Sequence, residues 1–175
     1  MTTPEISKIS DLTAEAQALV KDDLPPSQYL DLLEQHSRFR DAVRFLAHKL
    51  EVKQAIQWAH SVAKELQPPD EKQGEESLAA VDRWLQKSDD ASRWKAMNTA
   101  EKAGISSAGD CVAMAVFFSG GSITPPEAPE TQPPPYFAQK MAADSIVLAV
   151  FSHAADQATE RYRQALAMGR KLDAG

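Results

Sequence analysis

The segment from Asp110 to Pro135, DCVAMAVFFSGGSITPPEAPETQPPP, constrains the fold more than any other part of this chain. Its apolar run over 111–118 predicts a buried helix, and the Ser-Gly-Gly-Ser sequence that follows predicts the end of that helix. Six prolines then fall between Pro125 and Pro135, which favours a polyproline stretch. We expect residues 123–135, called the strap below, to be a stiff connector lying across a helical body. A docking ligand for a partner is the alternative interpretation.

Helical periodicity recurs along the rest of the chain, whereas sustained two-residue alternation is nearly absent. The clearest apolar stripe contains Phe39, Val43, Leu46 and Leu50, spaced i, i+4, i+7 and i+11. Similar patterns predict helices over residues 11–20, from 27 onward, and over 39–50, 55–66, 78–85, 89–103, 107–118, 136–153 and 156–172.

These patterns predict an all-α fold: one domain over residues 11–175, preceded by a flexible segment at 1–10. We expect about eight or nine helices arranged as successive antiparallel hairpins, with the strap inside the domain. Helices 107–118 and 136–153 are apolar around most of their circumference, so we place them at the centre. Because Ala42–Leu46 is echoed by Ala80–Leu85 with one inserted residue, a HEAT-like or TPR-like arrangement is a second interpretation for part of the chain.

Composition restricts the partners and the compartment. Lys and Arg number 19 against 25 Asp and Glu, a net charge of −6, so we expect no nucleic-acid partner. The apolar runs are far shorter than the ~20 residues needed to span a bilayer. The N-terminus carries no export-signal pattern, and the single cysteine suits a reducing compartment, which predicts a cytoplasmic protein without membrane insertion. We expect a monomer or a weak homodimer.

Residues that could carry chemistry are scattered. Cys111 lies in an apolar helix with no histidine nearby in sequence, and we interpret it as a core thiol. The four histidines, His36, His48, His60 and His153, lack the i, i+3 or i, i+4 spacing of metal ligands on one helix. Acid pairs such as Asp89-Asp90 lie in polar connectors or near helix starts, where negative charge is stabilising. We therefore expect no metal, no cofactor and no enzymatic activity; a thiol- or metal-dependent hydrolase is the alternative.

The stretch DAVRFLAHKLEVKQAIQWAHSVAKE, together with AVFFSGGSITPP and PPPYFAQKMAADSIVLAV, resembles an uncharacterised family of bacterial all-helical proteins, a domain of unknown function. The resemblance extends over Ser27–Leu172. It implies a small cytoplasmic protein, sometimes encoded near type VI secretion genes, and it implies no catalytic residues. Members of that family often carry a tryptophan at the position of Gln57, beside Trp58, so a paired indole surface is not implied for this chain.

We therefore predict a non-enzymatic interaction protein, an adaptor, accessory or chaperone-like protein that binds another protein. An immunity protein that neutralises a toxin is the other alternative, because the chain is small and acidic. We expect Trp58, Trp84 and Trp94 to be core residues. The predicted partner-binding residues lie at the end of the apolar helix and in the strap: Phe117, Phe118, Gly120, Gly121, Pro133, Pro134 and Pro135.

Overall fold

The computed structural model describes residues 1–68, 72–152 and 155–174. Every regular element in those ranges is a helix, which confirms the all-α prediction. In chain order they are α1 (Thr3–Ile9), α2 (Ala14–Gln17), α3 (Pro26–Gln35), α4 (Phe39–Lys49), α5 (Val52–Leu66), α6 (Glu75–Lys87), α7 (Asp90–Ala103), α8 (Ala108–Phe117), α9 (Phe137–Phe151), the 3₁₀ turn η1 (Ala155–Gln157) and α10 (Ala158–Asp173).

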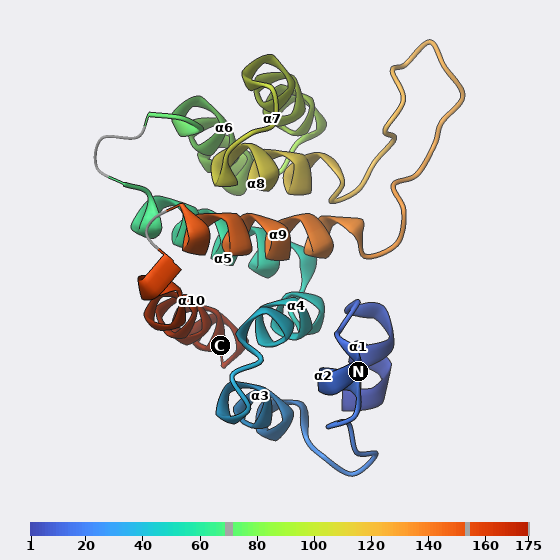
Figure 1. The fold of residues 1–175 in the computed structure, drawn as a ribbon. Helices are drawn as coiled ribbons and strands as arrows, with labels where there is room; N and C mark the ends of the chain where they lie inside the picture. Colours follow the sequence, from blue (N-terminus) through green and yellow to red (C-terminus); the bar gives the residue numbers. More distant parts are fainter. Residues whose placement is uncertain (69–71, 153–154, 175) are drawn as a thin grey trace.

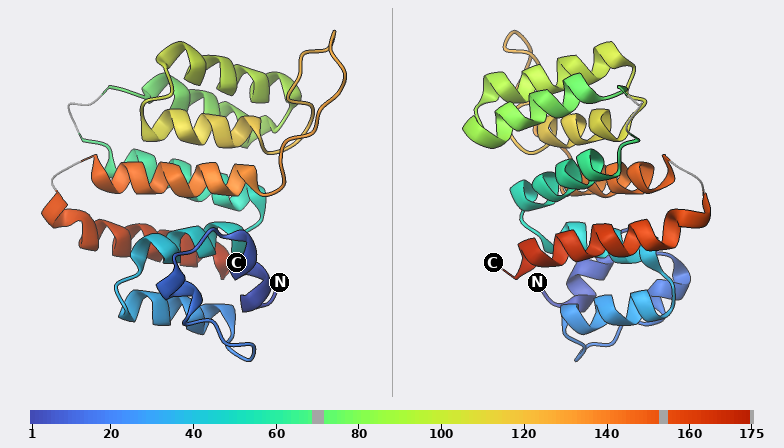
Figure 2. Two further views of the ribbon diagram at one scale, coloured as in Figure 1. Left: turned by 45° about the vertical axis from the view of Figure 1, so that its right-hand side comes forward. Right: turned by 90° about the vertical axis from the view of Figure 1, so that its left-hand side faces the viewer.

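The helices form successive layers with α9 in the middle (Figures 1 and 2). Helices α6, α7 and α8 pack together at one end of the molecule, and α8 lies against α9. Helices α5 and α4 also contact α9, and α10, α3 and α1 pack on α4 at the other end. The predicted central position is therefore confirmed for helix 136–153, now α9, whereas helix 107–118, now α8, lies between α9 and the end formed by α6 and α7.

Packing between neighbours in sequence follows the hairpin prediction only in part. Helices α6 and α7 pack closely against each other, as expected. Helices α4 and α5 contact each other at few residues and pack mainly on α9. The apolar stripe of α4 is buried as predicted, from Phe39 to Leu50. Periodicity identified the buried faces of both helices, but the partner of those faces lies almost a hundred residues further along the chain.

The N-terminus, predicted to be a flexible segment, contains helix α1. Thr2 accepts a bond from the Glu5 backbone N–H and donates its own backbone N–H to the Glu5 carboxylate, which forms a capping box for α1. Ile6 is buried on α4, and the Thr3 hydroxyl donates to Leu24 O. These contacts fix residues 3–9 as part of the folded body.

The helix predicted over residues 11–20 is shorter than expected. Ser10 ends α1 and donates its hydroxyl to Ile6 O. Asp11 has a φ of 52°, which breaks the helical path, and α2 begins only after its N-cap, Thr13. The Thr13 backbone N–H and hydroxyl both donate to the buried carboxylate of Asp41, which ties α2 to α4.

Helix α10 approaches α4 and α5 through a glycine. Gly169 is buried against the Trp58 ring and Leu46, so closely that a Cβ there would lie 2.6 Å from Trp58 Cε2. The Trp58 indole N–H donates to Ala165 O, one turn earlier on the same helix, at 2.7 Å. Arg170, which the sequence places at the negative end of its helix, also pairs with Glu34 at 2.6 Å and so links α10 to α3.

The strap does not lie across the bundle. It projects past the helices beside the N-terminal end of α7 (Figures 1 and 2). Proline restricts φ and so stiffens a chain, but it does not set the direction in which the chain leaves a helix. That direction is set at the end of α8.

Candidate partner-binding site

The predicted partner-binding residues lie where α8 ends and the strap begins, a region called the junction below (117–122). Phe117 is the last residue of α8 and is buried, whereas Phe118 and Gly120 are half-buried and Gly121 is exposed. Gly121 has a φ of +69°, a conformation that favours glycine, and a Cβ there would lie 3.1 Å from the Arg93 guanidinium. Glycine at this position therefore serves both the turn and the close approach of Arg93.

Arg93 of α7 holds the junction together. Its side chain is buried, and it donates from Nη1 to Phe117 O at 2.8 Å and from Nη2 to Ser122 O at 2.7 Å. Its Nε and Nη2 also pair with Asp90 Oδ1, at 2.8 and 2.7 Å. A cation at a helix C-terminus satisfies carbonyls that have no intrahelical partner. Arg93 thus ends α8 and fixes the start of the strap with one side chain.

A row of aromatic rings continues from this arginine to α9. The Trp94 ring meets the Phe117 ring edge to face at 5.0 Å, and the Phe118 ring meets Phe117 at 5.2 Å. Phe118 then contacts Phe137 at 4.6 Å, across the two ends of the strap. Trp94 is only half-buried, so its prediction as a core residue is confirmed less fully than those of Trp58 and Trp84. A partly exposed indole therefore lies beside the junction.

The strap closes on itself through its own hydrogen bonds. The Ile123 N–H donates to Thr131 O at 2.8 Å, and the Thr131 N–H donates back to the Ser122 hydroxyl at 3.2 Å. The Thr124 hydroxyl donates to Pro129 O at 2.7 Å, and the Ala128 N–H donates to Pro125 O at 3.0 Å. The expected polyproline stretch is therefore interrupted by a turn at 125–128, and the strap is a closed loop.

The structure places the three consecutive prolines of the site apart from the junction residues. Pro133 is half-buried, while Pro134 and Pro135 are exposed on the returning arm of the strap. This arm leads into Tyr136, which has a φ of 60° and caps α9. The aromatic and glycine residues are thus brought together around Arg93, and Pro134 and Pro135 form a separate exposed stretch.

Two hollows flank the Arg93–Asp90 pair. One, of about 260 Å³, lies between α7 and the strap and is lined by Asp90, Arg93, Trp94, Ser122, Thr124, Pro125, Pro126, Ala128 and Glu130. The other, of about 370 Å³, lies on the side of the glycines and is lined by Trp84, Ser88, Asp89, Asp90, Arg93, Ser119, Gly120 and Gly121. Both hollows are lined by a tryptophan and by two carboxylates, so the surface around the junction is contoured and acidic.

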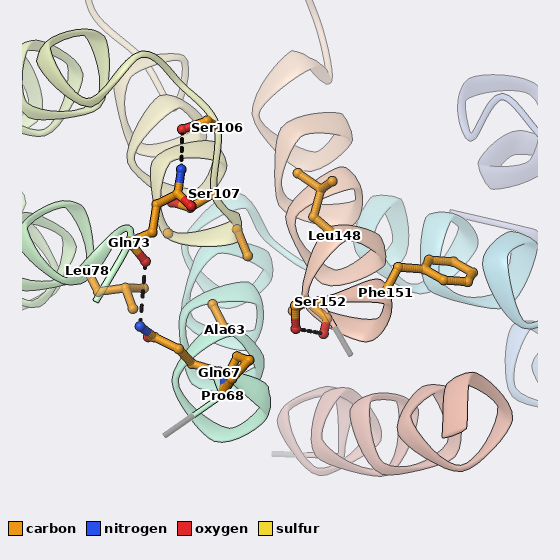
Figure 3. A pocket seen from close by; sticks show the side chains of 13 residues that line it. Ala63, Gln67, Pro68, Gln73, Leu78, Ser106, Ser107, Leu148, Phe151 and Ser152 are labelled. Atoms are coloured by element: carbon orange, nitrogen blue, oxygen red, sulfur yellow. Dashed lines mark hydrogen bonds between the residues drawn. The ribbon is translucent and has the colours of Figure 1, made fainter. Parts of the chain in front are cut away.

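A third hollow, of about 230 Å³, lies at the opposite end of α8 and was not predicted (Figure 3). Leu148 of α9 and Ser152, which follows that helix, form one side of it, and Gln67 and Gln73 face them from the connection between α5 and α6. Leu148 is 46% exposed. Because the lining comes from four helices and their connections, no local pattern in the sequence could have indicated it.

The N-terminal end of α8, which borders this third hollow, is already paired with a carboxylate of the same chain. The buried Asp110 carboxylate accepts from the Ser106 and Ser107 N–H groups at 3.1 and 3.0 Å and from the Ser77 hydroxyl at 2.6 Å. The positive end of α8 therefore faces a carboxylate of its own chain, which disfavours an anionic ligand there.

The candidate catalytic residues of the sequence are not brought together. Burial raises the pKa of the Cys111 thiol to about 11, with the carboxylates of Asp110 and Asp144 adding to the effect, so the thiol is protonated at neutral pH. Across the described ranges, no group of three or more His, Cys, Asp or Glu side chains could hold a metal ion. His153 lies outside the described residues.

The other histidines occupy structural positions. His48 is buried and its Nδ1 lies 2.8 Å from Arg44 O. His60 is also buried, with Nε2 3.2 Å from Asp82 Oδ1 but without the alignment of a hydrogen bond. His36 is exposed at the end of α3.

No helix in the described part of the chain is long and apolar enough to cross a membrane. Comparison with curated proteins and with solved structures gave no significant match. A family model described as a family of unknown function, DUF6931, matches residues 29–173, which include α4 to α10, the strap and the part of α3 from Tyr29 onward. By this match, the chain belongs to the DUF6931 family.

Proposed function

We propose that the protein is a non-enzymatic binding protein, an adaptor or accessory protein that binds another protein through the junction and the strap. The observation that carries this proposal is the strap itself, which projects beyond the helices in one hydrogen-bonded conformation (Figure 1). A loop already ordered before binding loses little conformational entropy in a complex. The buried Arg93 supports this role, because it anchors the loop to rigid helices.

The chemistry of the exposed surface favours a protein partner. Tryptophan and arginine are enriched at the centres of protein interfaces, and the half-buried Trp94 lies beside exposed prolines of the strap. The protonated thiol of Cys111 supports the non-enzymatic proposal over a thiol-dependent hydrolase. The bacterial origin and the secretion link implied by the family resemblance make an apparatus component the first partner to test, in the cytoplasm.

Replacement of the tip of the strap tests the proposal. The hydrogen bond between Ile123 and Thr131 holds the two arms together, so residues 124–130 can be replaced by a four-residue Gly-Ser turn without stretching the chain. The tagged wild-type protein and this variant would be used to capture partners from the native cell, with identification by mass spectrometry. We expect a specific protein to be captured by the wild type and lost in the variant, with unchanged circular dichroism.

A charge-matched pair of variants controls for surface effects. Pro126→Lys with Pro134→Lys alters two exposed positions of the strap, and Gln28→Lys with Gln35→Lys adds the same charge to α3 at the far end of the molecule. Capture should be lost with the first pair and kept with the second. Equal capture by the wild type and both strap variants would refute the proposal.

A further inference from the structure

We propose that the hollow between α7 and the strap receives a basic side chain, arginine or lysine, from the partner; this inference rests on the proposed binding function. The hollow measures about 260 Å³, which is large enough for one long side chain. The shape of its lining and the charges of its lining residues both favour a basic side chain.

The walls of the hollow suit the aliphatic stem of such a side chain. Trp94 forms one wall, and Pro125 and Pro126 form part of the wall contributed by the strap. The hydrocarbon stems of arginine and lysine pack on apolar surfaces while their charged ends remain near water. The Arg93 guanidinium already lies over the Trp94 ring, 5.5 Å from its centroid, so the indole offers the partner's side chain apolar surface for its stem.

Two carboxylates of the lining can receive the positive charge. Asp90 is 69% exposed at its side chain and uses only Oδ1 to bind Arg93; its Oδ2 accepts no bond from the described residues. Glu130 accepts a bond from the Gln132 amide at Oε1, 2.8 Å away, and its Oε2 likewise has no partner within the described ranges. The carboxylates come from α7 and the strap, so a cation between them would join the two elements.

Arg93 also lines the hollow, but its positive charge does not outweigh the two negative charges of the lining. The lining contains two acids, Asp90 and Glu130, and one cation, Arg93, which leaves a net charge of −1 (1 − 2). The Arg93 guanidinium already donates to Asp90, Phe117 O and Ser122 O. An anionic ligand would have to displace these bonds, whereas a cationic ligand would use carboxylate oxygens that are open. Charge therefore selects a basic group over an acidic one.

A peptide with a neutral twin tests the inference. The probe is acetyl-Gly-Arg-Ser-Arg-Ser-Arg-Gly-amide, and its twin carries citrulline, which has the shape of arginine without the charge, at all three arginine positions. Binding is followed by NMR through the indole N–H of Trp94 and the backbone N–H groups of the strap. The arginine peptide should shift these signals in a saturable way, and the citrulline peptide should leave them in place.

Matched variants assign the binding to the hollow. Glu130→Gln removes one carboxylate of the lining and should weaken binding about threefold, the size of one exposed ion pair. Glu127→Gln removes an exposed carboxylate that belongs to the same strap but does not line the hollow. This variant should weaken binding less than Glu130→Gln does. Asp90→Asn keeps an acceptor for Arg93 and should also weaken binding.

The outcomes separate this inference from the proposed function. Equal shifts with both peptides, no shift with either, or equal weakening by Glu130→Gln and Glu127→Gln would overturn the basic-side-chain inference. If capture of the cellular partner were nevertheless lost on replacement of the strap tip, the binding function would stand with a different occupant. A peptide that binds as expected, combined with capture that survives the replacement, would refute the binding function at the strap.

Discussion

Replacement of Gly169 by alanine should destabilise the protein, although alanine is the better helix former. Gly169 lies inside α10, where glycine costs about 1 kcal/mol relative to alanine by helix propensity alone. The close packing around Gly169 opposes that gain in stability. A Cβ at this position would lie 2.6 Å from Trp58 Cε2 and 2.8 Å from Leu46 Cδ2, whereas ordinary contacts begin at 3.4 Å.

The magnitude follows from how far the neighbours must move. Relief of the closest contact requires a displacement of 0.8 Å (3.4 − 2.6) between α10 and the Trp58 ring. That ring is fully buried and is held by its bond to Ala165 O, so it cannot rotate away. Overpacking of this kind costs about 1–3 kcal/mol, and rigid neighbours favour the upper end. After subtraction of the propensity gain, we expect Gly169→Ala to lower the free energy of unfolding by about 2 kcal/mol.

Urea unfolding followed by circular dichroism measures this free energy directly. The matched control is Ala167→Gly, an exposed position of the same helix, where only the propensity changes and a loss of about 1 kcal/mol is expected. The two variants therefore exchange the same residues in opposite directions and should both destabilise. A Gly169→Ala protein that is about 1 kcal/mol more stable than the wild type would refute the packing argument.

Three further perturbations test the junction and the buried groups. Arg93→Ala should lower the free energy of unfolding by about 2–3 kcal/mol in urea titrations, because Phe117 O and Ser122 O lose their donor; a change near zero would contradict the anchoring role. Burial lowers the pKa of His60 below its ordinary value near 6.5, so the unfolded chain binds the extra proton first. Stability should therefore hold above about pH 7 and fall below pH 6.5, and His60→Gln should reduce that dependence in unfolding curves at pH 5.5 and 7.5. With its pKa raised to about 11, Cys111 should react with a thiol reagent at pH 7.5 far more slowly in the native protein than in urea; equal rates would contradict its burial.

The sequence was sufficient for features that depend on near neighbours. The stripe from Phe39 to Leu50 predicted α4, and the helix predicted to end at residue 103 does end there, before Gly104 with a φ of +84°. Helix α1 was missed because it buries little apolar surface, although Thr2 and Glu5 carry the spacing of a capping box that could have indicated it.

Features that depend on distant parts of the chain were not predictable in the same way. The junction residues from Phe117 to Gly121 are close in space because they are close in sequence, but Arg93, which organises them, lies 24 residues before Phe117. Nothing in the local pattern around Arg93 distinguishes it from an exposed arginine on a polar helix face. The direction of the strap was also not predictable from the local sequence, because it depends on the bond from Arg93 to Ser122 O.

The central position of α9 has a consequence for biosynthesis. Helices α4, α5 and α8 all pack on α9, yet α9 begins only at Phe137, after each of them has been translated (Figure 2). A nascent chain that ends in the strap carries these three apolar faces without the helix that covers them. Because α9 is complete only at Phe151, productive collapse waits for the last quarter of the chain, and stalling before that point leaves a substrate for chaperones.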